Sequence, residues 1–258
     1  MKLASLGSGS KGNATLVAHE NAVVMVDCGF TMREACARLS TCGVMPEQLT
    51  AILVTHEHGD HVRGVLPLAR KYQIPVYMSV GTQLAMQATG RHNFQGVEVH
   101  AVSLGIVFEV AGMEVFPVTV PHDAREPCQY VFYHQGQQVG VLTDLGSITP
   151  HIVETYRNCD ALLLEFNHDV TMLAEGPYPY SLKQRVGGRL GHLNNQQAAS
   201  LLQQVEQSKL QHLVLSHISE QNNHPELALA AATNEGGFDV QRVLVADQQQ
   251  GFDWLNVQ

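Results

Sequence analysis

Seven consecutive residues, Thr55–His61, constrain this chain more than any other stretch. They read Thr-His-Glu-His-Gly-Asp-His, which places three imidazoles and two carboxylates side by side. The apolar run Ala51–Val54 directly before them predicts a buried strand, so the cluster stands where a strand gives way to a loop and then a helix. Functional sites of α/β folds lie at the carboxyl ends of strands. The cluster therefore predicts a metal site, and the metal indicates hydrolysis.

The composition is typical of a compact enzyme, and we predict a single domain over residues 1–258. Hydrophobic residues make up 45% of the chain and charged residues 15%. The sequence has no apolar run of about 18 residues, and its N-terminus turns glycine-rich before a signal-peptide core could form. The five scattered cysteines are expected to be reduced thiols. We therefore expect a cytoplasmic protein without a membrane segment.

Strands and helices alternate along the whole chain, which favours an α/β fold of mixed type. Thr31–Leu39 is predicted as a helix with a capping box of Thr31 and Glu34, and another helix should run from the histidine cluster to about Lys71. The remaining predicted strands include a meander of Val97–Val102, Ile106–Val110 and Met113–Val118, the pair Gln129–Tyr133 and Gln138–Leu142, Ala161–Glu165, Leu213–Leu215, and Val240–Val245 as the last strand. Two mixed sheets covered by helices, a four-layer αββα sandwich, fit this order.

The spacing inside the cluster suits two ions. His56 and His58 lie two residues apart and can face one ion, whereas Asp60 and His61 can turn to a second ion about 3.5–4 Å away. Imidazole and carboxylate ligands suit zinc, manganese or iron(II). The alternative is a polar loop whose histidines are satisfied by ordinary hydrogen bonds.

The pattern His-x-His-x-Asp-His after an apolar strand resembles the metallo-β-lactamase fold superfamily of metallohydrolases. The resemblance implies that His122 completes the site of His56 and His58, and that His217 joins Asp60 and His61. It further implies that Asp144 bridges the two ions, which then activate a shared water as hydroxide. Asp27 matches a structural aspartate that orients the histidine loop. Each of these residues also has an ordinary alternative, such as a turn, a helix cap or a core position.

Several segments resemble the YycJ/WalJ-type branch of that superfamily, which is linked with nuclease activity on DNA and is similar to phosphodiesterase members. These segments are Ser5–Asn13, Asn167–Asp169, Gly176–Pro179, Gly191–Leu193 and Leu215–Asn223. The resemblance implies a nucleic-acid substrate, DNA more than RNA. It gives no indication of the oligomeric state.

Phosphodiester cleavage needs a proton for the leaving oxygen, and we predict that His192 donates it. We count Asp60, a ligand of the second ion, with His192 among the catalytic residues. The alternative for His192 is to cap the helix that begins at about Asn194. His168 follows the Ala161–Glu165 strand and either contacts the substrate or a metal ligand, or only caps and packs.

Two segments are candidates for phosphate binding. Ser8–Asn13 offers backbone amides together with Lys11 and Asn13, although a glycine-rich turn is more often structural. Lys183, Arg185 and Arg189 form the densest basic segment and lead to His192. This segment matters because the net charge of −9 argues against a broad electrostatic grip on nucleic acid, but not against a local basic patch.

We therefore predict a dinuclear metal-dependent hydrolase, a phosphodiesterase or nuclease. The alternative is a metallohydrolase of another ester, such as a thioester or a lactone, because the metal loop alone does not separate the two. A binding module is the least favoured reading, since a structural zinc site closes with four ligands and this set holds more.

Overall fold

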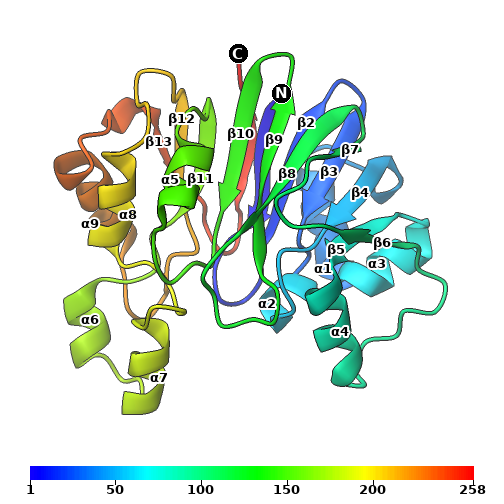
Figure 1. The fold of residues 1–258 in the computed structure, drawn as a ribbon, viewed down its shortest axis with the longest axis horizontal. Coiled ribbons are helices and arrows are strands. Elements are labelled where there is room, and N and C mark those ends of the chain that lie inside the picture. Colours follow the sequence, from blue (N-terminus) through cyan, green and yellow to red (C-terminus); the bar gives the residue numbers. More distant parts are fainter.

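The computed structural model describes residues 1–258 as two seven-stranded sheets with helices on their outer faces (Figure 1). The strands are β1 (Lys2–Gly7), β2 (Ala14–His19), β3 (Ala22–Val26), β4 (Leu49–Leu53), β5 (Val76–Ser79), β6 (Val99–Val102), β7 (Phe108–Val110), β8 (Met113–Thr119), β9 (Cys128–His134), β10 (Gln137–Leu142), β11 (Ala161–Glu165), β12 (His212–Ser216), β13 (Val243–Val245) and β14 (Phe252–Asn256). The helices are α1 (Met32–Thr41), α2 (Gly59–Val62), α3 (Val65–Tyr72), α4 (Val80–Ala88), α5 (Pro150–Tyr156), α6 (Val170–Glu175), α7 (Tyr180–Val186), α8 (Asn195–Leu202) and α9 (Pro225–Ala230).

Each sheet mixes parallel and antiparallel neighbours. The first sheet has the order β14-β1-β2-β3-β4-β5-β6, and the second has β13-β12-β11-β10-β9-β8-β7. In both, the early strands pair antiparallel and the later ones pair parallel. The predicted four-layer αββα sandwich of mixed α/β class is confirmed.

Three buried clusters hold the four layers together, and apolar burial is the main source of their stability. The cluster between the sheets includes Val26, Tyr130 and Leu163. The outer face of the first sheet packs against α1, α3 and α4, with Leu39 and Leu68 at its centre. A third cluster joins the second sheet to α5, α8 and α9. Strands of both sheets are therefore buried on both faces, which explains their continuous apolar runs.

The strand assignments differ from the sequence prediction where pairing is non-local. Val97–Val102 was expected in a meander with Ile106–Val110, but β6 pairs parallel with β5 in the first sheet, while β7 and β8 belong to the second. Val243–Val245 is not the last strand, because β14 returns to pair with β1. The prediction failed at both points because strand periodicity reports burial and does not report which strand lies alongside.

The helix prediction was right about α1 and less complete elsewhere. Thr31 and Glu34 form the predicted capping box. The helix expected through Lys71 is broken between α2 and α3 at Gly64, whose Cβ would lie 2.3 Å from the Phe30 carbonyl oxygen if it had one. Helices α4, α6 and α7 were not predicted. None of the helices has the length and apolar character needed to cross a membrane.

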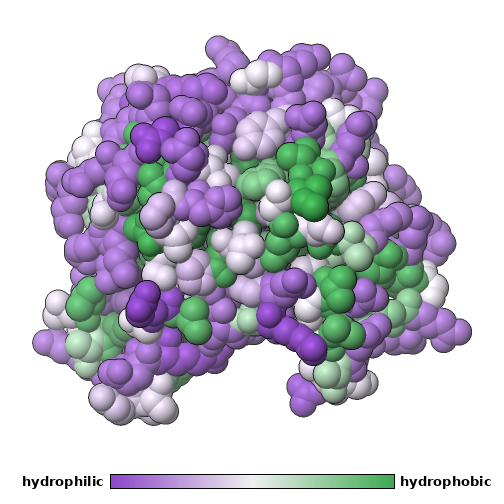
Figure 2. All heavy atoms as spheres, in the orientation of Figure 1, coloured by the Kyte–Doolittle hydropathy of each residue, from purple (hydrophilic) through white to green (hydrophobic).

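The carboxyl ends of the parallel strands meet at one edge of the sandwich. Figure 1 shows this edge at the bottom, with both chain termini at the opposite end. In the same view, Figure 2 shows the lower edge hollowed between two projections, formed by α6 with α7 on one side and by α4 on the other. Hydrophilic residues line much of the rim of this hollow. The predicted site residues follow strands that end at this edge.

Candidate metal centre

All seven predicted ligands come together at the lower edge of the sandwich. Four of them follow β4, one follows β8, one follows β10 and one follows β12: His56, His58, Asp60, His61, His122, Asp144 and His217. Ligand atoms approach one another in three overlapping triplets, and Asp144 belongs to two of them: His56, His58 and His122; His56, His61 and Asp144; Asp144, His192 and His217.

The three-histidine cluster consists of His56, His58 and His122. The Nδ1 atom of His58 lies 3.0 Å from Nε2 of His56 and 3.3 Å from Nε2 of His122. Nitrogens that share a tetrahedral zinc at about 2.0–2.1 Å are about 3.3 Å apart, so these three atoms already have the mutual spacing of ligands. The cluster fits one divalent ion.

The aspartate-rich cluster consists of Asp60, His61, Asp144 and His217. The Nε2 atom of His61 lies 3.2 Å from a carboxylate oxygen of Asp144 and 3.6 Å from one of Asp60. His217 lies with Nδ1 2.9 Å from Asp144 and with Nε2 3.9 Å from Asp60. Two imidazoles and two carboxylates within this range make a second group whose donor types suit a divalent ion.

Neighbouring groups fix which nitrogen each ring presents. Thr55 donates its hydroxyl hydrogen to Asp27, so its oxygen accepts from Nδ1 of His56 at 2.9 Å. The Nδ1 atom of His61 donates to Asp27 at 2.8 Å. In both rings the neighbour holds Nδ1, so Nε2 is the nitrogen turned toward the other ligands. Such supporting hydrogen bonds are a general feature of metal-binding histidines, and Asp27 lies where the sequence prediction put it.

His122 is held in the same way by a backbone group. Its Nδ1 donates to the carbonyl oxygen of Gly191 at 3.0 Å. A Cβ at Gly191 would lie 2.2 Å from the carbonyl oxygens of Arg185 and Val186, so only glycine allows the chain to pass this close. The glycine therefore allows the close passage that orients His122.

Burial and neighbouring charges determine which side chains of the site are neutral and which are charged. Burial, assisted by the neighbouring His61, holds the pKa of His56 well below its usual value, and burial also lowers the pKa of His122. Burial alone would raise the pKa of Asp144, but His217 and His61 hold it well below the usual value. Neutral imidazoles and an ionised carboxylate are the states in which these side chains bind metal.

Three residues of the site adopt left-handed backbone conformations. The φ angles are 61° for Asp27, 50° for Asp144 and 52° for His217. Such angles are uncommon for residues other than glycine and often mark functional sites. Each residue follows a strand by one or two positions; Asp144 and His217 line the cavity there, and Asp27 is buried against His61.

His192 lies beside both clusters. Its ring centroid is 5.3 Å from that of His122 and 5.2 Å from that of His217. Its Nδ1 donates to the buried carboxylate of Glu165 at 2.6 Å. Burial would lower the pKa of His192, but Glu165 outweighs it and raises the pKa to about 9. The imidazole is therefore protonated at neutral pH, with Nε2 free to donate.

The predicted substrate residues are only partly brought to the site. Arg185 lies at the cavity but pairs with Asp123. Lys183 turns away and donates to the carbonyl oxygen of Ala174 at 2.6 Å. The side chain of Arg189 is exposed and does not line the cavity. The basic segment therefore contributes one cation rather than three.

The remaining candidates take supporting or separate positions. Lys11 is exposed and paired with Glu220 at 2.6 Å. Asn13 is buried, with its amide nitrogen 3.2 Å from Nε2 of His61 and 3.4 Å from Asp60. His168 is buried outside the cavity, and burial lowers its pKa to about 4.

Four contributors to the site were not predicted: Thr55, Asp123, Glu165 and Gly191. Glu165 had a signal in the sequence, because it ends the otherwise apolar strand β11 and is fully buried. Its other carboxylate oxygen accepts the backbone amides of Leu145 and Leu193. A carboxylate in that place binds two loops and His192 together.

The clusters face a polar cavity of about 340 Å³. Besides site residues, its walls include Ser10, Tyr178, Leu182 and Arg185. Few of its lining side chains are apolar, and the cavity opens on the hollowed edge seen in Figure 2. Such walls suit a charged or strongly polar group.

Comparison with known proteins agrees with this architecture. The family model of the beta-lactamase superfamily domain matches residues 23–218. This chain belongs to that superfamily. It is 34% identical over 238 residues to exodeoxyribonuclease YycJ of Bacillus anthracis, covering 91% of this chain and 90% of that protein. It is 33% identical to exodeoxyribonuclease WalJ of Streptococcus pneumoniae, covering 91% and 87%.

The fold is similar to that of a solved structure of the same superfamily. The metallo-β-lactamase fold protein YhfI from Bacillus subtilis superposes with a TM-score of 0.75 at 18% sequence identity, covering 98% of both chains. The predicted membership of the metallo-β-lactamase fold superfamily, with likeness to YycJ and WalJ, is confirmed.

Proposed function

We propose that this chain is a metal-dependent phosphodiesterase that hydrolyses DNA. The observation that carries the proposal is the position of His192, whose Nδ1 is hydrogen-bonded to the buried Glu165 carboxylate beside the groups of possible metal ligands. A phosphodiester needs both features, because its cleavage builds negative charge on phosphate oxygens and leaves an alkoxide that must be protonated.

We assign one divalent ion to each cluster. His56, His58 and His122 would hold the first ion, Asp60, His61 and His217 the second, and Asp144 would contact both. When bound, such ions activate water as a nucleophile near neutral pH and neutralise charge on the phosphate. The donor sets suit zinc or manganese, with iron also compatible.

The protein's own part in the reaction is positioning and proton transfer. Asp27, Thr55 and Gly191 fix the rings that hold the ions. His192 Nε2 gives its proton to the leaving oxygen as the phosphorus–oxygen bond breaks, and Glu165 stabilises the charged imidazole before that transfer.

The alternative, hydrolysis of a thioester or lactone, fits the cavity less well. A thioester releases a thiolate, which needs little help from an acid. The cavity also lacks the apolar wall that an acyl chain would require. DNA is favoured over RNA because the two relatives that share about nine-tenths of this chain are named exodeoxyribonucleases. The cytoplasmic location stays a prediction.

The proposal is tested by metal analysis and a substrate panel. We expect about two divalent ions per chain after gentle purification. With zinc or manganese, the protein should hydrolyse end-labelled DNA and bis-p-nitrophenyl phosphate, and EDTA should abolish both activities.

End-labelled RNA, a thioester and a lactone complete the panel, with Asp144→Asn as the inactive control. Hydrolysis confined to the carbon esters would defeat the phosphodiesterase assignment. A single ion or none would defeat the assignment of one ion to each cluster.

A further inference from the structure

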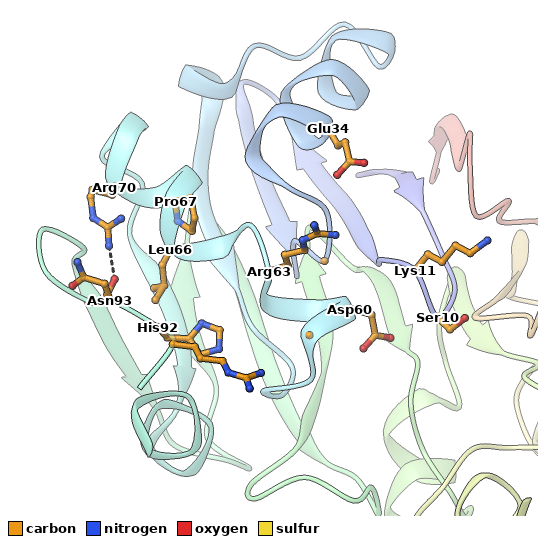
Figure 3. A pocket seen from close by; sticks show the side chains of 13 residues that line it. Ser10, Lys11, Glu34, Asp60, Arg63, Leu66, Pro67, Arg70, His92 and Asn93 are labelled. Carbon is orange, nitrogen blue, oxygen red and sulfur yellow. Dashed lines mark hydrogen bonds between the residues drawn. The ribbon is translucent and has the colours of Figure 1, made fainter. Parts of the chain in front are cut away.

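A second, larger groove adjoins the candidate metal centre. Its volume is about 840 Å³, and it extends from Asp60 toward α3 and the segment that follows α4. Figure 3 shows Arg63 in the middle of this groove, with Lys11 beyond Asp60 on one side and Arg70 on the other. Arg91 also lines it. The groove thus gathers four cations from three separate segments.

The groove and the cavity of the metal centre form one continuous surface. Ser10, Gly59 and Asp60 line both of them. Asp60 is an expected ligand of the second ion, so the groove begins directly at the ion site. A substrate that places one phosphodiester at the metal centre and continues in this direction enters the groove.

Two of the four cations are free. Arg63 and Arg91 are exposed, and neither guanidinium makes a hydrogen bond or an ion pair within the chain. Arg70 is fixed by donation from Nε to the carbonyl oxygen of Gln95 at 2.8 Å, and Lys11 is paired with Glu220. Unpaired arginines are suited to bind phosphate, which accepts two parallel hydrogen bonds from a guanidinium.

Neither carboxylate that lines the groove, Glu34 or Asp60, forms an ion pair with Arg63 or Arg91. Glu34 is occupied at the start of α1, where it accepts from the amide and the hydroxyl of Thr31 at 3.0 and 2.6 Å. Asp60 faces the aspartate-rich cluster. The guanidinium groups of Arg63 and Arg91 are therefore left for a ligand from outside the chain.

On the opposite side of the metal centre, the basic side chains of α7 are already bonded within the chain. There Arg185 is already paired with Asp123, and Lys183 is bonded to a backbone carbonyl. Arg189, which follows α7, is exposed but does not line the cavity, so the unpaired cations that border the metal centre are those of the Arg63 groove.

We propose that this groove binds the sugar–phosphate backbone of a single-stranded polynucleotide beside the scissile phosphodiester, with Arg63 and Arg91 contacting its phosphates. The inference rests on the proposed function, because the strand is placed by the phosphodiester at the metal centre. A positively charged groove that follows one backbone is the usual way in which proteins bind single strands without reading their sequence.

The test compares two charge-reversed double variants of the full chain. Arg63→Glu/Arg91→Glu removes the free cations of the groove. Lys2→Glu/Arg157→Glu makes the same change in net charge far from it. Lys2 lies at the end of β1 opposite to the Ser8–Asn13 loop. Arg157 follows α5, near the ends of β10 and β11 that lie away from the metal centre. All four side chains are exposed.

Binding is measured by fluorescence anisotropy with a labelled 20-mer phosphorothioate strand in the presence of zinc or manganese. We expect the groove variant to bind about tenfold or more weakly than the control variant. Its salt dependence should also fall, by about 1.4 in the slope of log K against log salt for two lost phosphate contacts.

Equal affinity of the two double variants would overturn the proposal that the groove binds the strand. Circular dichroism and thermal unfolding of both variants exclude misfolding, and Arg63→Gln/Arg91→Gln should give an intermediate loss of affinity. Hydrolysis of bis-p-nitrophenyl phosphate by the wild type reports the metal centre separately. Absence of this hydrolysis would defeat the proposed function. The binding comparison would still show whether the groove binds the strand.

Discussion

The three-histidine cluster and the aspartate-rich cluster use the same residue type in different surroundings. His56 and His122 rest on neutral groups, a hydroxyl and a backbone carbonyl, and their pKa values are lowered. His61 rests on the carboxylate of Asp27, and although burial opposes it, the nearby Asp144, Asp60 and Asp27 hold its pKa well above the usual value. The carboxylates around His61, first of all Asp144 and Asp60, therefore raise its pKa, whereas burial prevails at His56 and His122.

His192 extends this contrast beyond the ligands. It rests on Glu165 as His61 rests on Asp27, and its Nδ1 lies closer to Glu165, at 2.6 Å, than to Asp144, at 3.7 Å. A carboxylate behind an imidazole thus has two uses here. It strengthens a ligand where an ion is close, and it keeps a proton available where the ring faces the cavity.

The largest effect should come from Asp144→Asn, because Asp144 is the group expected to serve both clusters. We expect a loss of metal from both sites and a fall in kcat/KM of about 10³-fold, the scale of several kcal/mol of lost charge stabilisation. Metal analysis and hydrolysis of bis-p-nitrophenyl phosphate provide the measurements.

The matched control is His58→Ala, which touches only the three-histidine cluster. It should keep one ion where Asp144→Asn keeps none. Equal metal loss in the two variants would show that the clusters do not act as separate sites.

His192→Ala should have the next largest effect, and the effect should depend on the leaving group. Loss of a general acid costs about 10²–10⁴-fold when the leaving oxygen needs a proton. DNA releases a basic alkoxide, whereas bis-p-nitrophenyl phosphate releases a stable phenolate. We therefore expect a much larger loss on DNA than on the nitrophenyl ester, with the metal content unchanged. Equal losses on both substrates would point to a structural role for His192.

Asp27→Asn should act only through His61 and give a smaller loss. Removing a group that supports a metal-binding histidine typically costs about 10–100-fold in affinity or activity. Oδ2 of Asp27 accepts from both the Thr55 hydroxyl and Nδ1 of His61, so an amide oxygen in its place keeps both contacts and removes only the charge beside His61. Competition with a chelator should therefore release one ion more readily and leave the other unaffected. Parallel weakening of both ions would contradict the separation of the clusters.

The sequence predicts those residues of the site that lie in one continuous segment. Thr55–His61 is continuous, so its composition alone indicates metal binding. His122, Asp144 and His217 come from three distant strands, and only the resemblance to a known superfamily connected them. Glu165 was missed because its role depends on β11 lying next to β10, which places its carboxylate below the loop of Leu145.

The same limit explains the errors in fold and charge. Periodicity identified most of the strands but not their partners, so β6 was assigned to the wrong sheet and β14 was overlooked. Arg63 and Arg91 are 28 positions apart and belong to no basic run, yet they line one groove. Lys183, Arg185 and Arg189 form a run, yet only Arg185 lines the cavity of the metal centre. Clustering in sequence was a poor guide to clustering in space.

The smallest expected effect is a shift in pH dependence from Glu165→Gln. A general acid works below its pKa, so activity on DNA should fall as the pH rises through the pKa of His192, which Glu165 raises to about 9 in the free protein. Bound cations repel the proton, so the fall should begin somewhat below that value in the holoenzyme. The variant lacks the carboxylate, and the pKa of His192 should drop because burial then dominates. The alkaline limb of the DNA profile should move to lower pH, while the profile for bis-p-nitrophenyl phosphate keeps its shape. A DNA profile that does not move would mean that Glu165 only anchors the Leu145 and Leu193 loops, and the carboxylate behind His192 would no longer parallel the one behind His61.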